Sequence, residues 1–447
     1  MSVLIESECP VVDSVRAESP AAAPEEQRGA WRLLFQYGGS LLDQSLVSGT
    51  RFATSILIGT FCGAAELGIY AIGFSILMSF HALQLSLICR PFTIFGNQIE
   101  GRARQTLAGS ALMQFVIFAV LLSLILGGTV MAMKWYSIES YLTPILLILA
   151  VGTPFILLRE HARQYCLATM QIGTITVIDM TATTIQLAGL GCLVWTEQLS
   201  AVSAVASTAV AAGVAGLLWL WLDRDAIRVV LSGVAADVRR HWKIGRWDCA
   251  SEVASTFQIY GMTWILAVLL DNAAVGIFAA CMMSIQVLNP FLLGVTGLLV
   301  PKTARAYSSR GASGLHTFVR NTTVLLGLVT AVLAVVIAIR GPSILEQLYS
   351  GQGFVIPVSV VAVLVSGAVA EVIGIGPENG VWAMERHDLN FRAQLFGCIV
   401  TCVSAFLLIS TFGLIGAATS FFLARLTTMI VQWMSYRTAV KALAITD

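Results

Sequence analysis

Runs of about 20 apolar residues recur along almost the whole chain, and each is long enough to cross the hydrocarbon core of a bilayer as an α-helix. The hydropathy pattern predicts twelve such spans, which lie at residues 36–61, 67–94, 107–133, 141–158, 172–195, 199–222, 246–270, 274–299, 317–339, 355–376, 393–412 and 414–436. Composition agrees, because 57% of the 447 residues are hydrophobic and 11% are charged, whereas a soluble domain carries about 25% charged residues. We therefore expect an all-α integral membrane protein with twelve transmembrane helices.

Basic residues are distributed unevenly between the two sides of these spans. Twenty-two Lys and Arg residues lie on the side of the chain termini, and two, Lys134 and Arg340, lie on the opposite side. Because cytoplasmic loops carry the excess of Lys and Arg, this asymmetry predicts that both termini are cytoplasmic. Residues 1–30 lack the apolar core of a secretory signal, and we expect them to form a disordered cytoplasmic tail.

The two halves of the chain resemble each other. The segment GAAELGIYAIG at 63–73 matches NAAVGIFAAC at 272–281 in a shared glycine and in the residues that follow it. Six spans per half is an even number, so the halves have the same orientation and form parallel repeats, which typically move about a central site. We expect a six-helix bundle at 31–222, a cytoplasmic linker at 223–245, and a second six-helix bundle with a short tail at 246–447, arranged around a central cavity.

Charged and polar residues inside the spans mark candidate functional sites, because ionisable groups within a membrane usually face a cavity or the bundle interior. One helical face of the first span carries Ser40, Gln44, Ser48, Arg51 and Ser55. The carboxylates that we take as candidates for binding a coupling ion are Asp43, Asp179, Glu252 and Glu371. Arg425 adds a cation in the last span, and Gln186 follows Asp179 on its helix face. For His81 we favour a packing role, and for Arg90 a side chain that reaches the membrane interface.

Motifs typical of enzymes and of bound cofactors are absent. The chain contains no GxxxxGK[ST], HExxH or GxSxG sequence, and its nine cysteines include no CxxC pair. The net charge of +1 gives no bulk attraction to nucleic acid. We therefore expect no enzyme, no cofactor, no metal site and no nucleic-acid partner, and the candidate coupling ion is H⁺ or Na⁺.

Three stretches resemble polysaccharide transporters. GAAELGIYAIGFSILM at 63–78 resembles the G-x-x-E-x-G-x-Y-A turn between their first two spans, and SLLDQSLVSGTRF at 40–52 looks like their first span. TFGLIGAATSFFLARL at 411–426 is similar to the opening of their last span. These transporters form the oligosaccharide-lipid flippase branch of the multidrug/oligosaccharidyl-lipid/polysaccharide superfamily, and the resemblance covers residues 30–440.

The resemblance implies a flippase that moves a polyprenyl-pyrophosphate-linked oligosaccharide from the inner to the outer leaflet of a bacterial inner membrane, with polysaccharide-synthesis enzymes as candidate partners. It also implies a positively charged central cavity, in which a guanidinium group holds the pyrophosphate. The residues expected to line this cavity and bind substrate are Arg51, Gln44, Ser48, Arg425 and Gln186.

Two other interpretations stay open. A multidrug or metabolite antiporter of the same superfamily would use the carboxylates for a cationic substrate and would leave Arg51 as a structural partner. A membrane scaffold without transport activity would tolerate paired apolar replacement of its intramembrane charges.

Overall fold

The computed structural model describes residues 46–446 except positions 97, 139, 231–232 and 350–353, and its regular elements are all helical. Asp43 and Gln44 of the predicted site lie outside this part of the chain. The first described helix is Leu46–Cys62. The elements that follow it are α2 (Ala64–Gln84), the π-helix η1 (Leu85–Cys89), α3 (Arg90–Gly96), α4 (Gly101–Trp135), α5 (Thr143–Ala168), α6 (Ile172–Trp195), α7 (Ala201–Leu222), the 3₁₀ turn η2 (Arg224–Ala226), α8 (Val234–Leu269), α9 (Asn272–Gln286), α10 (Asn289–Leu348), α11 (Val358–Ala383) and α12 (His387–Thr446).

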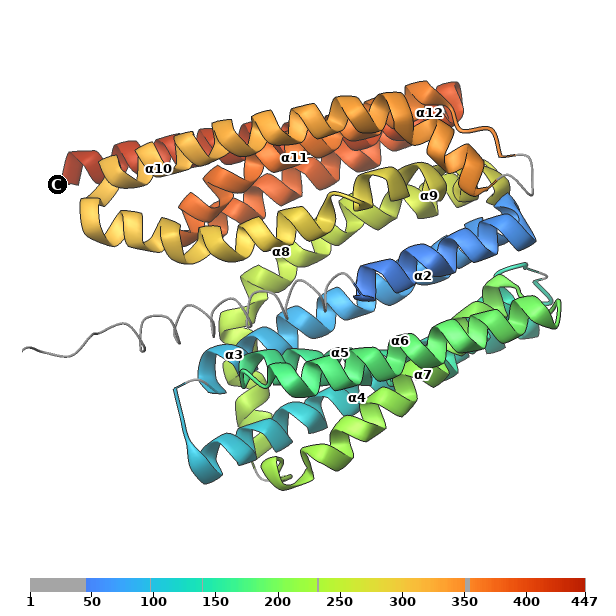
Figure 1. Ribbon diagram of the computed structural model, residues 1–447. Coiled ribbons are helices and arrows are strands. Elements are labelled where there is room, and N and C mark those ends of the chain that lie inside the picture. The colour runs from blue at the N-terminus through green and yellow to red at the C-terminus, as the bar shows by residue number, and fades with distance from the viewer. Residues whose placement is uncertain (1–45, 97, 139, 231–232, 350–353, 447) are drawn as a thin grey trace, which may run out of the picture.

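The helices form two bundles. We call the first helix together with α2 to α7 the N-half, and α8 to α12 the C-half. In Figure 1 the N-half, coloured blue to green, lies below the C-half, coloured yellow to red, and α8 runs between them. Near the start of α8, Nδ1 of His241 lies 3.1 Å from Oε1 of Gln114 on α4. Residues 234–245 of the predicted linker form the first part of α8. The contact of His241 with Gln114 attaches this part of the helix to the N-half.

The two longest helices bend where the hydropathy pattern predicted turns. α10 and α12 span 60 residues each and contain one glycine outside helical geometry, Gly311 with φ 59° and Gly413 with φ 57°. This left-handed backbone conformation is strained for residues that carry a Cβ, so glycine allows the chain to turn sharply there. Gly413 occupies the predicted break between 393–412 and 414–436.

α5 is longer than the sequence pattern predicted. The predicted span ended at residue 158, whereas α5 continues to Ala168. Arg159 and Arg163, assigned from the sequence to the cytoplasmic flank, therefore lie on the helix, with side chains 12% and 8% exposed. The charges had suggested a loop, but the helix continues because they are paired inside the bundle.

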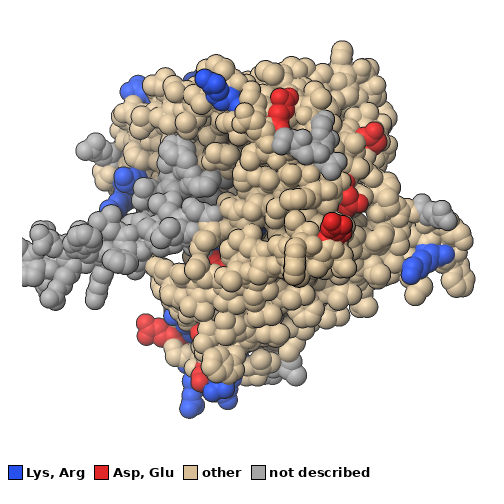
Figure 2. Space-filling view, turned by 45° about the vertical axis from the view of Figure 1, so that its right-hand side comes forward, with Lys and Arg blue, Asp and Glu red and all other residues tan. Residues whose placement is uncertain are grey.

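The surface of the molecule is largely apolar. Eight of the described helices are long and apolar enough to cross a membrane, judged by length and composition. Most of the face shown in Figure 2 carries no charged side chain. Leu124, Leu328 and Phe406 are 67%, 65% and 62% exposed. Such a surface suits contact with lipid, because hydrocarbon does not penalise exposed apolar side chains.

Among the described residues, the buried apolar cluster that joins the two halves lies at one end, whereas at the other end the apolar clusters are separate and α8 contacts the N-half. The largest cluster of buried apolar residues includes Leu67 from the N-half and Val275 from the C-half, and it lies beside the turns that follow the first helix and α8. At the opposite end, the cluster around Trp219 belongs to the N-half and the cluster around Leu315 belongs to the C-half. We call these ends the joined end and the divided end. The halves are thus closed against each other at the joined end.

α2 and α9 cross at the joined end with their backbones in contact. A Cβ added at Gly68 would overlap the carbonyl group of Asn272, and a Cβ added at Gly276 would overlap that of Ala64. These residues occupy equivalent positions in the two segments matched in the sequence, so the contact is symmetric. The structure thereby places the two segments that match in the sequence directly against each other.

Candidate functional site

A cavity of about 240 Å³ lies between the two halves, and we call it the central cavity. The N-half lines it with Arg51, and the C-half lines it with Glu371 and Arg425. The other lining residues include Ser55, Tyr70, Phe74, Tyr260, Thr263, Phe278, Met282, Gln286 and Phe421. The two arginines that the sequence predicted to face a cavity therefore line the same one, from opposite halves.

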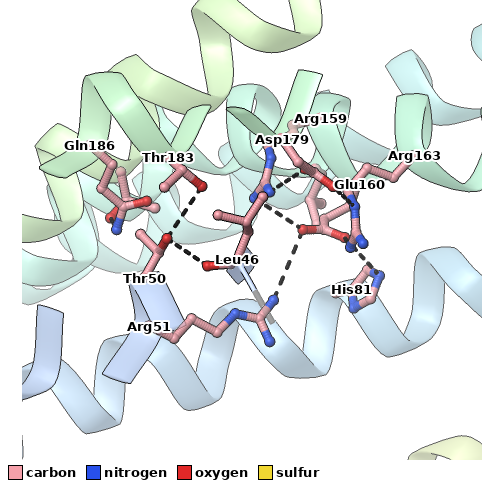
Figure 3. A network of polar contacts seen from close by, with 12 residues as sticks. Leu46, Thr50, Arg51, His81, Arg159, Glu160, Arg163, Asp179, Thr183 and Gln186 are labelled. Carbon is pink, nitrogen blue, oxygen red and sulfur yellow. Dashed lines mark hydrogen bonds and ion pairs between the residues drawn. The ribbon is translucent and has the colours of Figure 1, made fainter. Parts of the chain in front are cut away.

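Arg51 lies on the N-half wall of the central cavity, and its side chain is 38% exposed. Its Nη2 atom is 4.0 Å from Oε1 of Glu160, and its Cζ atom is 5.6 Å from the centre of the Phe74 ring. Figure 3 shows the side chain extending towards Glu160. A separation of 4.0 Å is an electrostatic contact and too long for a hydrogen bond, so Glu160 does not fix the guanidinium group in place.

Arg51 belongs to a group of charged side chains between the first helix, α2, α5 and α6, and the other members of the group are more deeply buried than Arg51. We call this group the N-half charged cluster, and its members are Arg51, His81, Arg159, Glu160, Arg163 and Asp179 (Figure 3). Asp179 is fully buried and accepts hydrogen bonds from Nη2 of Arg159 and, at 2.7 Å, from Nε of Arg163. Because buried charges are stable only when they are paired, these contacts tie α5 to α6.

Glu160 is bound more loosely than Asp179. It is 3% exposed, and its carboxylate oxygens lie 3.5 Å from an Nη atom of Arg159 and 3.5 Å from one of Arg163. Nε2 of His81 is 3.7 Å away. Glu160 is therefore surrounded by basic groups, all at distances of 3.5 Å or more.

The C-half wall of the central cavity carries a second arginine–carboxylate pair. Nε of Arg425 on α12 lies 3.5 Å from Oε2 of Glu371 on α11, and the side chains are 5% and 41% exposed. A further cavity of about 370 Å³ in the C-half is lined by the same two residues and by Glu378. Nε2 of Gln432 donates a hydrogen bond of 3.4 Å to Oε2 of Glu378. This wall therefore presents carboxylate groups to the cavities.

Two other described residues that the sequence predicted to bind substrate, Gln186 and Ser48, do not line the central cavity. Gln186 is buried, and its Nε2 atom donates to two threonine hydroxyl groups at 3.0 and 3.1 Å. It lines a small cavity of about 50 Å³ in the N-half, next to Arg51. Ser48 is half-buried on the first helix and lines neither of these cavities. Of the predicted face, Arg51 and Ser55 are the described members that reach the central cavity.

The carboxylates predicted to bind a coupling ion lie in different environments. Asp179 is held by two arginines in the N-half charged cluster, and Glu252 on α8 pairs with Arg90 at 3.0 Å. Among the described candidates, Glu371 alone lines the central cavity. In the part of the chain that the structure describes, no group of three or more His, Cys, Asp or Glu side chains could hold a metal ion.

Sequence analysis missed Glu160 and gave His81 a packing role. A signal was present, because REHAR at 159–163 follows an apolar run directly, without a glycine, proline or other turn residue. Charges at 159, 160 and 163 share one side of a helix that continues through them. Their partners lie on α2, α6 and the first helix, and no local spacing in the sequence connects them.

Solved structures share this architecture at low sequence identity. An inward-facing multidrug resistance MATE family transporter of the MOP superfamily matches with a TM-score of 0.77 and 15% identity, covering 90% of this chain and 96% of that one. An outward-facing MATE family transporter matches with a TM-score of 0.66 and 14% identity, covering 92% and 95%. A MOP superfamily transporter from Pyrococcus furiosus, whose binding pocket is described as having reverse polarity, matches with a TM-score of 0.67 and 14% identity, covering 92% and 96%. The chain has the MATE fold.

The MATE fold agrees with the predicted all-helical, multi-pass architecture. The sequence matches no family model and no curated protein. Membership of the flippase branch therefore stays a prediction from the three resembling stretches. The TM-score is higher against the inward-facing transporter than against the outward-facing one.

Proposed function

We propose that the protein is an alternating-access transporter with twelve transmembrane helices, located in a bacterial inner membrane with both termini in the cytoplasm. The divided end would then face the cytoplasm and the joined end the outside. Support comes from the MATE fold, from the two-half arrangement and from the excess of Lys and Arg predicted on the cytoplasmic side. Rocking of the N-half against the C-half would expose the central cavity to each side in turn.

The substrate that we propose is a polyprenyl-pyrophosphate-linked oligosaccharide, moved from the inner to the outer leaflet. The observation that carries this proposal is the position of Arg51, which is exposed in the central cavity and is not hydrogen-bonded to its nearest described carboxylate. A guanidinium group binds phosphate oxygens in pairs, and this pairing is stronger in a cavity of low dielectric constant than in water. The lipid tail would stay in the bilayer while Arg51 holds the pyrophosphate.

The proposal also covers the coupling ion, the partners and the absence of chemistry. Among the described candidates, Glu371 is the carboxylate that we propose to bind H⁺ or Na⁺, since it is 41% exposed and lines the central cavity. Polysaccharide-synthesis enzymes remain the proposed partners because of the family that the sequence resembles. We propose no enzymatic step and no cofactor.

A cation-coupled multidrug or metabolite antiporter is the second candidate. The observation that favours it is the C-half wall, where Glu371 is exposed and Arg425 is buried. A cationic substrate would bind there, and the solved structures with this fold include multidrug resistance transporters. Neutralising Glu371 would then abolish transport, while changes at Arg51 would have smaller effects.

The deciding experiment is deletion of the protein in its host, followed by mass spectrometry of lipid-linked oligosaccharides. Cells are complemented with the wild type, with Arg51→Ala, or with Arg320→Ala as a control at an exposed arginine of α10. The flippase proposal expects a lipid-linked intermediate to accumulate and to be cleared by the wild type and the control, but not by Arg51→Ala. An unchanged lipid-linked pool together with altered sensitivity to cationic drugs would support the antiporter instead.

A further inference from the structure

Glu160 is the acidic neighbour of Arg51, and it is shared with other cations. Its carboxylate lies 4.0 Å from Arg51 and 3.5 Å from both Arg159 and Arg163. Asp179, by comparison, accepts shorter hydrogen bonds from the same two α5 arginines, while Glu160 accepts one of 3.5 Å from Nη1 of Arg163. The attraction of Glu160 is therefore divided among three guanidinium groups, and Arg51 receives the contact at the longest distance.

The guanidinium groups around Glu160 differ in how far they are exposed. Arg51, Arg159 and Arg163 all lie within 4.0 Å of its carboxylate. The α5 arginines are 12% and 8% exposed, whereas Arg51 is 38% exposed. Arg51 is consequently the guanidinium group of the cluster that an anion in the central cavity can reach.

We infer that Glu160 is a positioning residue that sets how tightly Arg51 holds an anionic substrate. This inference rests on the proposed function, because it takes the anion-binding role of Arg51 as given. With Glu160 ionised, Arg51 is partly neutralised, so it binds a pyrophosphate and also releases it on the far side. Without that charge, Arg51 binds the anion more tightly and releases it more slowly.

Two substitutions should change anion affinity in opposite directions. Glu160→Gln raises the net charge of the cluster and should tighten binding of inorganic pyrophosphate about tenfold. Arg159→Gln lowers the net charge of the cluster and removes one of the cations that compete with Arg51 for Glu160. Arg51 is then neutralised more strongly, and the affinity for pyrophosphate should fall about tenfold. The double variant restores the charge sum and should bind within about threefold of the wild type. Structural damage would weaken binding in all three variants.

The measurement is isothermal titration of pyrophosphate into the purified full-length protein in lipid nanodiscs. Glu160→Asp should behave like the wild type because it keeps the charge. Asp225→Asn is the matched control, since it neutralises a side chain that is 97% exposed and distant from the cluster. In export assays, Glu160→Gln should lower the maximal rate and also lower the substrate concentration needed for half of that rate.

The outcomes separate this inference from the proposed function. If the wild type binds pyrophosphate no better than Arg51→Ala, the proposed anion site is wrong. If binding depends on Arg51 but Glu160→Gln binds with wild-type or weaker affinity, the role inferred for Glu160 is wrong. If Glu160→Gln does not fold, the other two variants decide: recovery of affinity in the double variant relative to Arg159→Gln supports the inference, and no recovery overturns it.

Discussion

The two walls of the central cavity carry the same pair of residue types with opposite exposure. In the N-half the arginine faces the cavity, with Arg51 38% exposed and its partner Glu160 4% exposed as a side chain. In the C-half the carboxylate faces the cavity, with Glu371 41% exposed and Arg425 5% exposed. Each arginine also lies over a phenylalanine ring, at 5.6 Å in the N-half and 5.3 Å in the C-half. The two walls therefore carry the same residue types in opposite order from the surface inwards, although Arg51 lies on the first helix of its half and Arg425 on the last helix of the other.

This difference assigns separate tasks to the two walls. A cavity with positive charge on one wall and negative charge on the other can hold an anionic head group and a cation at the same time. Each ion binds to the wall of opposite charge, so the two ions do not compete for the same side chains. We expect the N-half to bind the substrate and the C-half to bind the coupling ion. Substitutions of equivalent charges should therefore have unequal effects, and the largest differences are expected deep in the N-half.

The strongest test is removal of the buried charge of Asp179. Asp179→Asn takes the anionic partner from two buried arginines, and breaking such a pair should cost about 3–5 kcal/mol of stability. Glu252→Gln, which breaks a pair with Arg90 in which both side chains are about one-third exposed, should cost about 1 kcal/mol or less. Thermal unfolding of the purified proteins in detergent measures both. Equal stability of the two variants would contradict a structural role that is specific to the N-half charged cluster.

The joined end should respond symmetrically, unlike the cavity walls. Gly68→Ala and Gly276→Ala each push a methyl group into the facing backbone carbonyl, and such overpacking costs about 1–3 kcal/mol. Both should shift the population towards a state open at the joined end, by about tenfold for each 1.4 kcal/mol. Spin labels at positions 195 and 355, both exposed near this end, report the opening as a longer distance. Gly127→Ala is the control because a Cβ there meets open space, and an effect of only one of the two glycine variants would contradict the symmetry.

Much of the fold follows from local sequence. Apolar runs predicted the helices. The predicted break at 412–414 is the turn at Gly413, because a glycine between two apolar runs can adopt the left-handed conformation that a sharp turn requires. The matched segments around Gly68 and Gly276 predicted the repeat, and the structure places these two glycines in contact. Helix formation depends on neighbours along the chain, so sequence patterns predict it well.

The pairing of charges could be predicted only in part. The helical stripe containing Arg51 placed this residue at a cavity, but spacing gave no indication of its partner on α5. The hydropathy pattern predicted that α5 ends at residue 158, because the charged residues that follow lower the mean hydropathy. In the folded protein Asp179 from α6 pairs with Arg159 and Arg163, and the helix continues. Compensation between distant helices is a property of the packed bundle, and a hydropathy window of one segment contains no information about it.

Glu371→Gln should separate coupling from substrate binding. If the C-half wall binds the coupling ion, this substitution should reduce export about tenfold, within the usual range of coupling energies. The affinity for pyrophosphate should change by less than about twofold, because the bound anion contacts the opposite wall. Titration in nanodiscs and export in cells provide the two readouts. A large gain in pyrophosphate affinity would mean that Glu371 acts on the substrate as we infer for Glu160, and the division of tasks between the walls would be wrong.

The smallest effect is expected at Glu252, although the sequence made it a candidate for ion coupling. Its carboxylate lies 3.0 Å from Nη2 of Arg90, and both side chains are about one-third exposed, at 28% and 35%. An exposed pair of this kind contributes about 0–1 kcal/mol, since water competes for both charges. Glu252→Gln and Arg90→Gln should therefore each keep export within about twofold of the wild type. Loss of export in Glu252→Gln alone would place the coupling ion on α8 rather than on α11, because a pair that only connects helices would lose the same contact in either variant.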